Sequence, residues 1–92
     1  MITTQSIITR ITDSFLMSEL GNELVIMNTQ TGVYLGLNEV SVEIYKQAEN
    51  PIKVEDLILK LVQLYDVSLS DCEAQTIECL EMMLSKGLVK ID

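Results

Sequence analysis

The stretch Asn28-Thr29-Gln30-Thr31-Gly32-Val33-Tyr34-Leu35-Gly36-Leu37-Asn38 decides how this chain folds. Turn-forming residues fill its first half, and the alternation of Val33, Leu35 and Leu37 predicts a short strand over residues 33–37. Asn38 then suits the N-cap of a helix. Neither proline nor a charged side chain blunts this strand. We expect it at the edge of a sheet, where free backbone N–H and C=O groups can accept another chain.

Two further strands precede this stretch. Residues 15–20 and 23–28 are largely apolar and flank Gly21-Asn22, a pair suited to a tight turn, so they predict a hairpin. Three consecutive strands with short connections form an antiparallel meander, in which the first and third strands are both edges. Residues 1–12 alternate Ile with polar residues, and the sequence leaves open whether they are flexible or add another strand.

Helices fill the rest of the chain. Asn50-Pro51 ends the first of them, and a second, mostly buried helix is expected from about Val54 to Tyr65. Ser70-Asp71-Cys72-Glu73 fits a capping box at the start of a third helix, which Lys86-Gly87 ends. Leu88 to Ile91 follow as a short extended tail. The sequence predicts a single α+β domain over residues 1–92, a three-stranded antiparallel sheet followed by three helices.

The third helix has a wider apolar arc than one packing contact needs. A helical wheel spreads this arc over about 160°, whereas about 100° suffices for one contact. Either the helix packs against two neighbours, or one flank of the arc lines a groove. The arc consists of Cys72, Thr76, Ile77, Cys79, Leu80, Met83 and Leu84.

Composition argues against several classes of partner. The chain has 92 residues, a net charge of −8 and only six Lys and Arg residues, so it lacks the clustered basic side chains that bind nucleic acid or an anionic membrane. No apolar run approaches the roughly 20 residues that cross a bilayer. The N-terminal segment lacks the basic start and continuous apolar stretch of a signal peptide. We expect a cytoplasmic protein with no nucleic-acid and no membrane partner.

The sequence offers little for catalysis or metal binding. It has no His to act as a general base, no Gly-rich phosphate loop and no nucleophile with an evident activating partner, so we expect no catalytic residues. Cys72 and Cys79 would lie about 10 Å apart on one helix, too far for a disulfide. We expect free thiols and, without His, neither a metal site nor a cofactor.

Several short motifs resemble those of a known family. Thr31-Gly32-Val33-Tyr34, then Leu37-Asn38 and Ile44-Tyr45, are similar to the TG-x-Y, LN and IW landmarks of PqqD-like RiPP recognition elements. These domains serve pathways of ribosomally made, post-translationally modified peptides (RiPPs). The resemblance covers about residues 15–89, and without Trp but with Thr31-Gly32 the chain looks most like the stand-alone B1 protein of lasso-peptide clusters. The remaining landmarks are Val54-Glu55-Asp56-Leu57, Tyr65-Asp66-Val67 and Lys86-Gly87-Leu88-Val89.

The resemblance implies a winged-helix-like domain that binds the leader region of a precursor peptide. The leader would add as a strand to residues 33–37 beside the third helix and be delivered to a leader peptidase or another maturation enzyme. Gln75 and Cys79 depart from the family's frequent Asp and large apolar residue, which puts a charged contact at position 75 in question and makes the pocket roomier. The implied peptide-binding residues are Val33, Tyr34, Leu35, Gly36, Leu37, Cys72, Gln75, Thr76, Cys79, Met82 and Met83.

Three alternatives stay open at this point. The same domain could serve another RiPP pathway, including that of PqqD itself. A winged-helix transcription regulator would share short strands and three helices, although residues 71–86 carry one Lys against four acidic residues, the reverse of a DNA-reading helix. The edge strand could instead be covered, either by the third helix or by a second copy in a homodimer.

Overall fold

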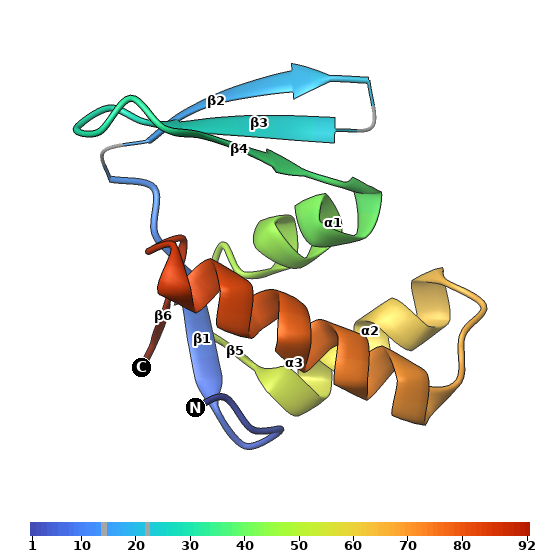
Figure 1. The fold of residues 1–92 in the computed structure, drawn as a ribbon. Coiled ribbons are helices and arrows are strands. Elements are labelled where there is room, and N and C mark those ends of the chain that lie inside the picture. Colours follow the sequence, from blue (N-terminus) through green and yellow to red (C-terminus); the bar gives the residue numbers. More distant parts are fainter. Residues whose placement is uncertain (14, 22) are drawn as a thin grey trace.

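The structure is a computed structural model that describes residues 1–13, 15–21 and 23–92 (Figure 1). It confirms the α+β fold, with a three-stranded antiparallel meander followed by three helices, and adds a second small sheet. In chain order the elements are β1 (Ile7–Arg10), β2 (Phe15–Leu20), β3 (Glu23–Asn28), β4 (Tyr34–Leu37), α1 (Glu39–Gln47), β5 (Ile52–Lys53), α2 (Val54–Leu64), α3 (Leu69–Ser85) and β6 (Val89–Ile91).

The predicted meander is present, with strand order β2-β3-β4. Leu24 lies opposite Leu37, and Ile26 lies opposite Leu35, so these side chains share the face that packs on the core. The third strand of the meander, β4, begins at Tyr34, one residue later than predicted, because Val33 still belongs to the preceding turn. The Val33 C=O nevertheless accepts the Asn28 N–H at 2.9 Å. The Asn22 half of the predicted Gly21-Asn22 turn lies outside the described residues.

Helix α1 starts where the sequence predicts. The Asn38 Oδ1 accepts the Ser41 N–H at 2.9 Å and so satisfies one of the free donors in the first turn. Tyr45 is buried on this helix and donates its hydroxyl hydrogen to the Ile11 carbonyl at 2.7 Å. Burial raises the pKa of Tyr45, and the nearby Arg10 opposes that shift. Tyr45 thus fastens α1 to the segment that joins the two sheets.

Helices α2 and α3 pack against each other through apolar side chains. The buried residues of α2 include Leu57 and Leu61, and those of α3 include Leu80 and Met83. The predicted capping box at Ser70 is wrong: Ser68 caps α3, and its Oγ accepts the Asp71 N–H at 3.2 Å. Ser68 and Asp71 are three residues apart, as are Ser70 and Glu73 of the predicted box. Because Ser68 is the N-cap, the helix begins about half a turn earlier than predicted.

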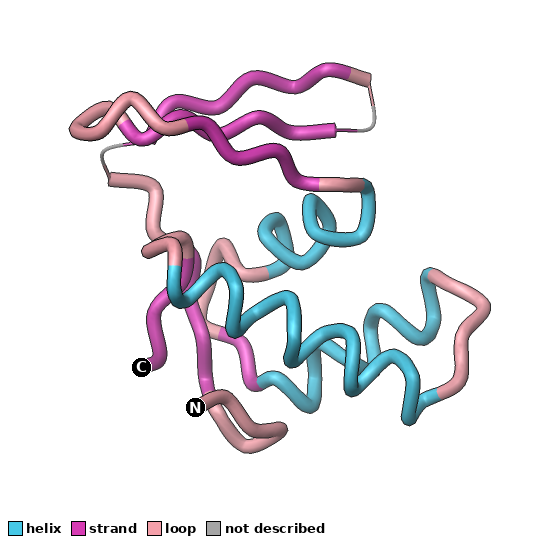
Figure 2. Tube along the Cα trace, viewed as in Figure 1, coloured by secondary structure: helices cyan, strands magenta, loops and turns pink. Residues whose placement is uncertain are grey.

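The second sheet joins one strand from each end of the chain to β5 from its middle, in the order β5-β1-β6 (Figure 2). Residues 7–10, which the sequence left unassigned, form its central strand, and the predicted tail after Gly87 forms β6. Ile8 is completely buried there, between Ile52 and Ile91. Strand β1 therefore links the start of α2 to the end of α3.

The first six residues complete the cap of α2. Lys53 occupies its N-cap without a side-chain hydrogen bond, and the Ser6 and Thr4 carbonyls accept the N–H groups of Val54 and Glu55 at 2.9 and 3.0 Å. The Ile2 side chain is buried, and its N–H donates to Glu81 on α3. Within the described residues, no helix is long and apolar enough to span a membrane.

Candidate peptide-binding cleft

Strand β4 presents one side of its backbone to solvent. It pairs with β3 alone among the described strands, so its other side is an open edge. The Asn28 N–H donates to the Val33 C=O. Hydrogen-bonded pairs recur at every second residue of an antiparallel ladder, so the backbone N–H and C=O groups of Leu35 and Leu37 also point toward β3. The N–H and C=O groups of Tyr34 and Gly36 consequently face the open edge.

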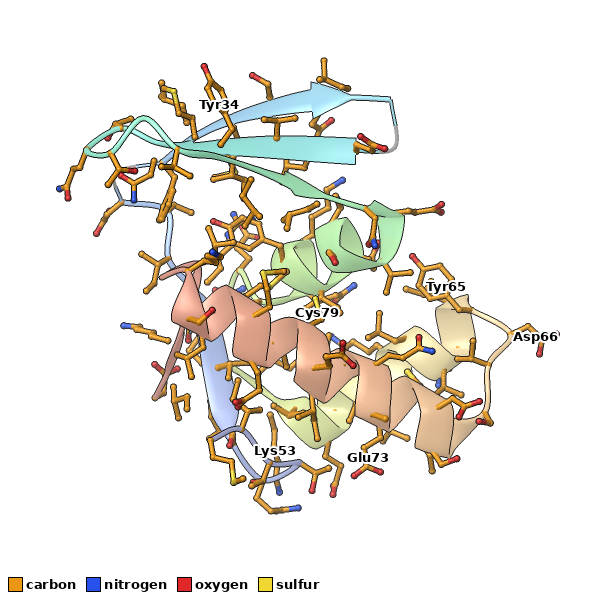
Figure 3. All side chains as sticks on the ribbon, in the orientation of Figure 1. Tyr34, Lys53, Tyr65, Asp66, Glu73 and Cys79 are labelled. Carbon is orange, nitrogen blue, oxygen red and sulfur yellow. The ribbon has the colours of Figure 1, made fainter. Side chains whose placement is uncertain are left out.

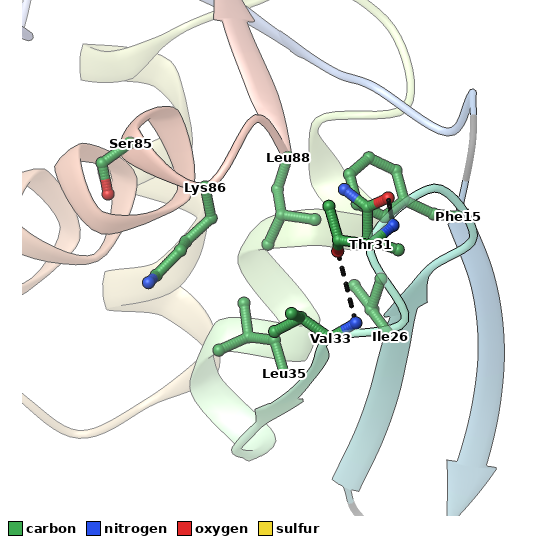
Figure 4. A pocket seen from close by; sticks show the side chains of 9 residues that line it. Phe15, Ile26, Thr31, Val33, Leu35, Ser85, Lys86 and Leu88 are labelled. Carbon is green, nitrogen blue, oxygen red and sulfur yellow. Dashed lines mark hydrogen bonds between the residues drawn. The ribbon is translucent and has the colours of Figure 1, made fainter.

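A hollow of about 280 Å³ opens between the start of β4 and the end of α3 (Figure 4). Its walls are mainly apolar, with Ile26 and Leu88 at the buried side and Val33 exposed at the mouth. The Thr31 Oγ1 accepts the Val33 N–H at 3.3 Å, which holds the turn that forms one rim. The lining residues are Phe15, Ile26, Asn28, Thr31, Val33, Leu35, Ser85, Lys86 and Leu88.

Two further hollows follow along α3 toward its N-terminus. The middle one measures about 290 Å³ and is lined by Ser41 of α1 and by Gln75, Glu78, Cys79 and Met82 of α3. The last one is small, about 40 Å³, and is lined by Val40, Leu61, Tyr65, Val67, Cys72, Gln75 and Thr76. We call the three together the β4–α3 cleft. From Lys86 to Cys72 it extends about 21 Å, the length of about six residues of extended peptide.

The structure divides the predicted binding residues into three groups. Val33, Tyr34, Gly36 and Gln75 are exposed. Leu35, Cys79 and Met82 are half-buried. The remaining four lie in the core: Leu37, Cys72, Thr76 and Met83.

Both explanations of the wide apolar arc on α3 apply at once. Its buried side packs against α2, while Cys79 faces α1 and, with Met82, lines the middle hollow (Figure 3). A charge placed at Met83, which is 0% exposed, would enter the core and not the cleft.

Sequence reasoning missed the polar lining residues, chiefly Ser41, Glu78, Ser85 and Lys86. An apolar wheel cannot find them, because polar side chains at a groove rim look like any solvated helix face. Ser41 comes from a different helix, and its Oγ lies 3.3 Å from the Cys79 Sγ. That hydrogen bond connects α1 to α3 beside the middle hollow.

Burial dominates the chemistry of the Cys79 thiol. It raises the pKa of Cys79; the hydrogen bond with Ser41 opposes this shift, and the negative charge of Glu78 adds to it. The thiolate is the reactive form of cysteine, so Cys79 is a poor nucleophile near neutral pH. Cys72 and Cys79 carry free thiols, and in the described part of the chain no three acidic or thiol side chains gather as metal ligands.

Alkylation should report this raised pKa directly. In a Cys72→Ala variant, the reaction of Cys79 with iodoacetamide is expected to accelerate with pH through a midpoint above that of a cysteine in the unfolded chain, because the folded state disfavours the thiolate. Mass spectrometry of timed samples between neutral and alkaline pH measures the rate, with urea-unfolded protein as the reference. A midpoint at or below the unfolded reference would contradict the burial of this thiol.

Comparison with known proteins agrees with this architecture. No curated protein matches the chain significantly. The solved structure of TbiB1 in complex with the TbiA(beta) leader peptide is similar, with a TM-score of 0.77 and 24% sequence identity over 89% of this chain and 95% of that chain. The family model described as coenzyme PQQ synthesis protein D matches residues 23–89, so this chain belongs to the PqqD family.

Proposed function

We propose that this protein binds the leader region of a ribosomally synthesised precursor peptide and delivers it to a maturation enzyme. The leader adds as a fourth strand to the open edge of β4 and lies in the β4–α3 cleft. The protein performs no chemistry itself and needs no cofactor. It acts by holding the precursor near the enzyme, which raises the effective concentration of the peptide.

The observation that carries this proposal is the position of the open edge of β4 beside the cleft. Strand addition needs unpaired backbone groups for affinity and neighbouring pockets for side-chain specificity. Tyr34 and Gly36 supply the backbone groups, and the first two hollows supply the pockets. Family membership and the shared fold of TbiB1, which was solved with a leader peptide, favour a leader as the occupant.

The alternation of side chains between the two faces of the sheet determines which residues of the peptide contact the cleft. Residues opposite Tyr34 and Gly36 turn their side chains to the outer face, where Tyr34 stands away from the helices (Figure 3). The intervening residues of the peptide point toward α3 and its hollows. The peptide side chains in the cleft therefore recur at every second position.

The pathway we propose is lasso-peptide biosynthesis, in the cytoplasm, with a leader peptidase as the receiving enzyme. The Thr31-Gly32 turn and the absence of Trp favour a B1-type protein over PqqD itself. A recognition role in another RiPP pathway is the second candidate, since the same cleft would serve it. A DNA-binding role is disfavoured by the charge of α3, on which Asp71, Glu73, Glu78 and Glu81 face solvent or lie partly exposed.

Titration with a synthetic leader tests the proposal. The probe is a synthetic leader, the N-terminal half of a candidate precursor peptide sought in the neighbourhood of this gene, with a scrambled peptide of equal composition as the control. We expect a dissociation constant of about 1 μM or tighter by calorimetry. Amide chemical-shift changes should centre on residues 33–37 and on α3 from Gln75 to Lys86, and bound leader should slow the alkylation of Cys79.

Millimolar binding, or shift changes that avoid both β4 and α3, would refute this role. Size-exclusion chromatography at two protein concentrations, with and without the leader, examines the homodimer. If a second copy covers β4, the dimer should dissociate as the leader binds. A dimer that persists with bound leader would use another surface.

A further inference from the structure

The β4–α3 cleft has a basic end and an acidic end. Lys86 lines the first hollow and is the only Lys or Arg among the described residues that line the three hollows. Glu78 lines the middle hollow and is the only acidic residue in that same set. The chain as a whole has a net charge of −8, so Lys86 places a positive charge beside a mainly apolar hollow in an otherwise acidic protein.

Both charged groups are available to a ligand. Arg10, Lys46 and Lys90 form ion pairs within the chain, whereas Lys86 and Glu78 are exposed and form none among the described residues. The Lys86 side chain lies on the α3 side of the hollow, across from Val33 and Leu35 on the strand side (Figure 4). A peptide strand placed between β4 and α3 would pass within reach of both charges.

The spacing of the two charges matches a strand. Glu78 and Lys86 are separated by about 12 Å along the axis of α3, which equals about four residues of extended peptide. Residues four positions apart in a strand point to the same face, so both partners of these charges would turn toward α3. The polar rim of each hollow could then hold one charged side chain of the peptide.

The order of the charges follows from the direction of the strand. The start of β4 lies at the Lys86 end of the cleft, and Ser41, which follows β4, lies at the Glu78 end. Every strand pair in the meander is antiparallel, and antiparallel pairs outnumber parallel ones in proteins. An antiparallel peptide passes Glu78 first and Lys86 second.

On this basis we infer a specificity rule that rests on the proposed function. The cleft selects a peptide with a basic residue followed four positions later by an acidic residue, the base at Glu78 and the acid at Lys86. Between them, the one residue that also faces α3, two positions after the base, is apolar and lies in the cleft. The charges fix the direction and register of the peptide, and the apolar contacts and backbone hydrogen bonds provide most of the affinity.

A displayed library of random ten-residue peptides tests this rule without knowledge of the precursor. The library is selected against the unaltered protein, against Lys86→Glu and against Glu78→Lys. Lys60→Glu on α2 and Asp66→Lys after α2 are the matched controls, because they change the net charge equally at exposed sites that line none of the three hollows. Thermal unfolding confirms that each variant is folded.

The unaltered protein and both controls are expected to enrich peptides with a basic residue four positions before an acidic one. With Lys86→Glu, the peptide position that contacts residue 86 should change its preference from acidic to basic residues. With Glu78→Lys, the position that contacts residue 78 should change its preference from basic to acidic residues. For one selected peptide, Lys86→Glu should weaken binding about two- to five-fold, and exchanging the acidic residue of the peptide for Lys should restore it.

The outcomes separate this rule from the function on which it rests. Enriched peptides with alternating apolar residues but no charge preference would overturn the rule and leave leader binding intact. Enrichment of the opposite order, acid before base, would overturn the antiparallel placement and with it the rule. If the library yields no enriched peptide with the unaltered protein or with any variant, the result would contradict the proposed function itself.

Discussion

Replacing Tyr34 with proline is expected to weaken leader binding about ten-fold or more, equivalent to about 1.4 kcal/mol. The Tyr34 N–H faces the open edge of β4, so proline removes a donor to the leader and leaves the ladder between β3 and β4 complete. The added leader strand would also leave one of its carbonyls without a partner, which costs about 1–3 kcal/mol if the group is buried. Calorimetric titration with the synthetic leader measures the loss.

Two neighbouring variants isolate the backbone effect. Tyr34→Ala removes the exposed side chain but keeps the N–H, so it should bind much better than Tyr34→Pro. Leu35→Pro removes an N–H that bonds β3 and should unfold the meander, as circular dichroism would show. Equal binding by Tyr34→Ala and Tyr34→Pro, with both folded, would rule out strand addition at this position.

Replacing Ile8 with alanine is expected to lower the free energy of unfolding by about 2–5 kcal/mol. Ile8 is 0% exposed at the centre of β1, where it packs between β5 and β6. A domain of this size is stable by about 5–15 kcal/mol, so this one truncation removes a large share. Urea denaturation followed by circular dichroism gives the difference.

Ile7 provides the matched control on the same strand. It is 43% exposed, and Ile7→Ala makes the same chemical change without opening a cavity in the core. We expect Ile7→Ala to cost less than about 1 kcal/mol. Similar losses for the two variants would mean that β1 does not contribute its buried face to the core as described.

Local signals in the sequence predicted most of strand β4 and of the turn and helix start on either side of it. The turn residues before Gly32, the alternation through Leu37 and the N-cap at Asn38 each act within a few residues, and the structure confirms all three. Such features depend on backbone preferences and short hydrogen bonds, which sequence patterns report well. The candidate strand of the binding site was therefore predictable to within one residue.

Non-local pairing was the main feature that the sequence did not reveal. Strand β1 pairs with β5 and β6, which lie more than forty and about eighty residues away along the chain. A four-residue strand gives little periodicity, and its partners are too short to identify alone. Likewise, a helical wheel identifies the apolar side of α3 but not the neighbour that covers each part of it, so Met83 and Cys79 looked equivalent.

The small sheet β5-β1-β6 also fixes where the chain can be joined to something else. Strands β1 and β6 pair in opposite directions, and the Asp92 N–H bonds the Ile7 carbonyl at 2.8 Å, so both termini emerge near this sheet. In Figure 1 they lie on the far side of α3 from the meander. An enzyme or a fluorescent reporter fused at the C-terminus would therefore lie on the opposite side of α3 from the open edge of β4 and leave that edge unobstructed.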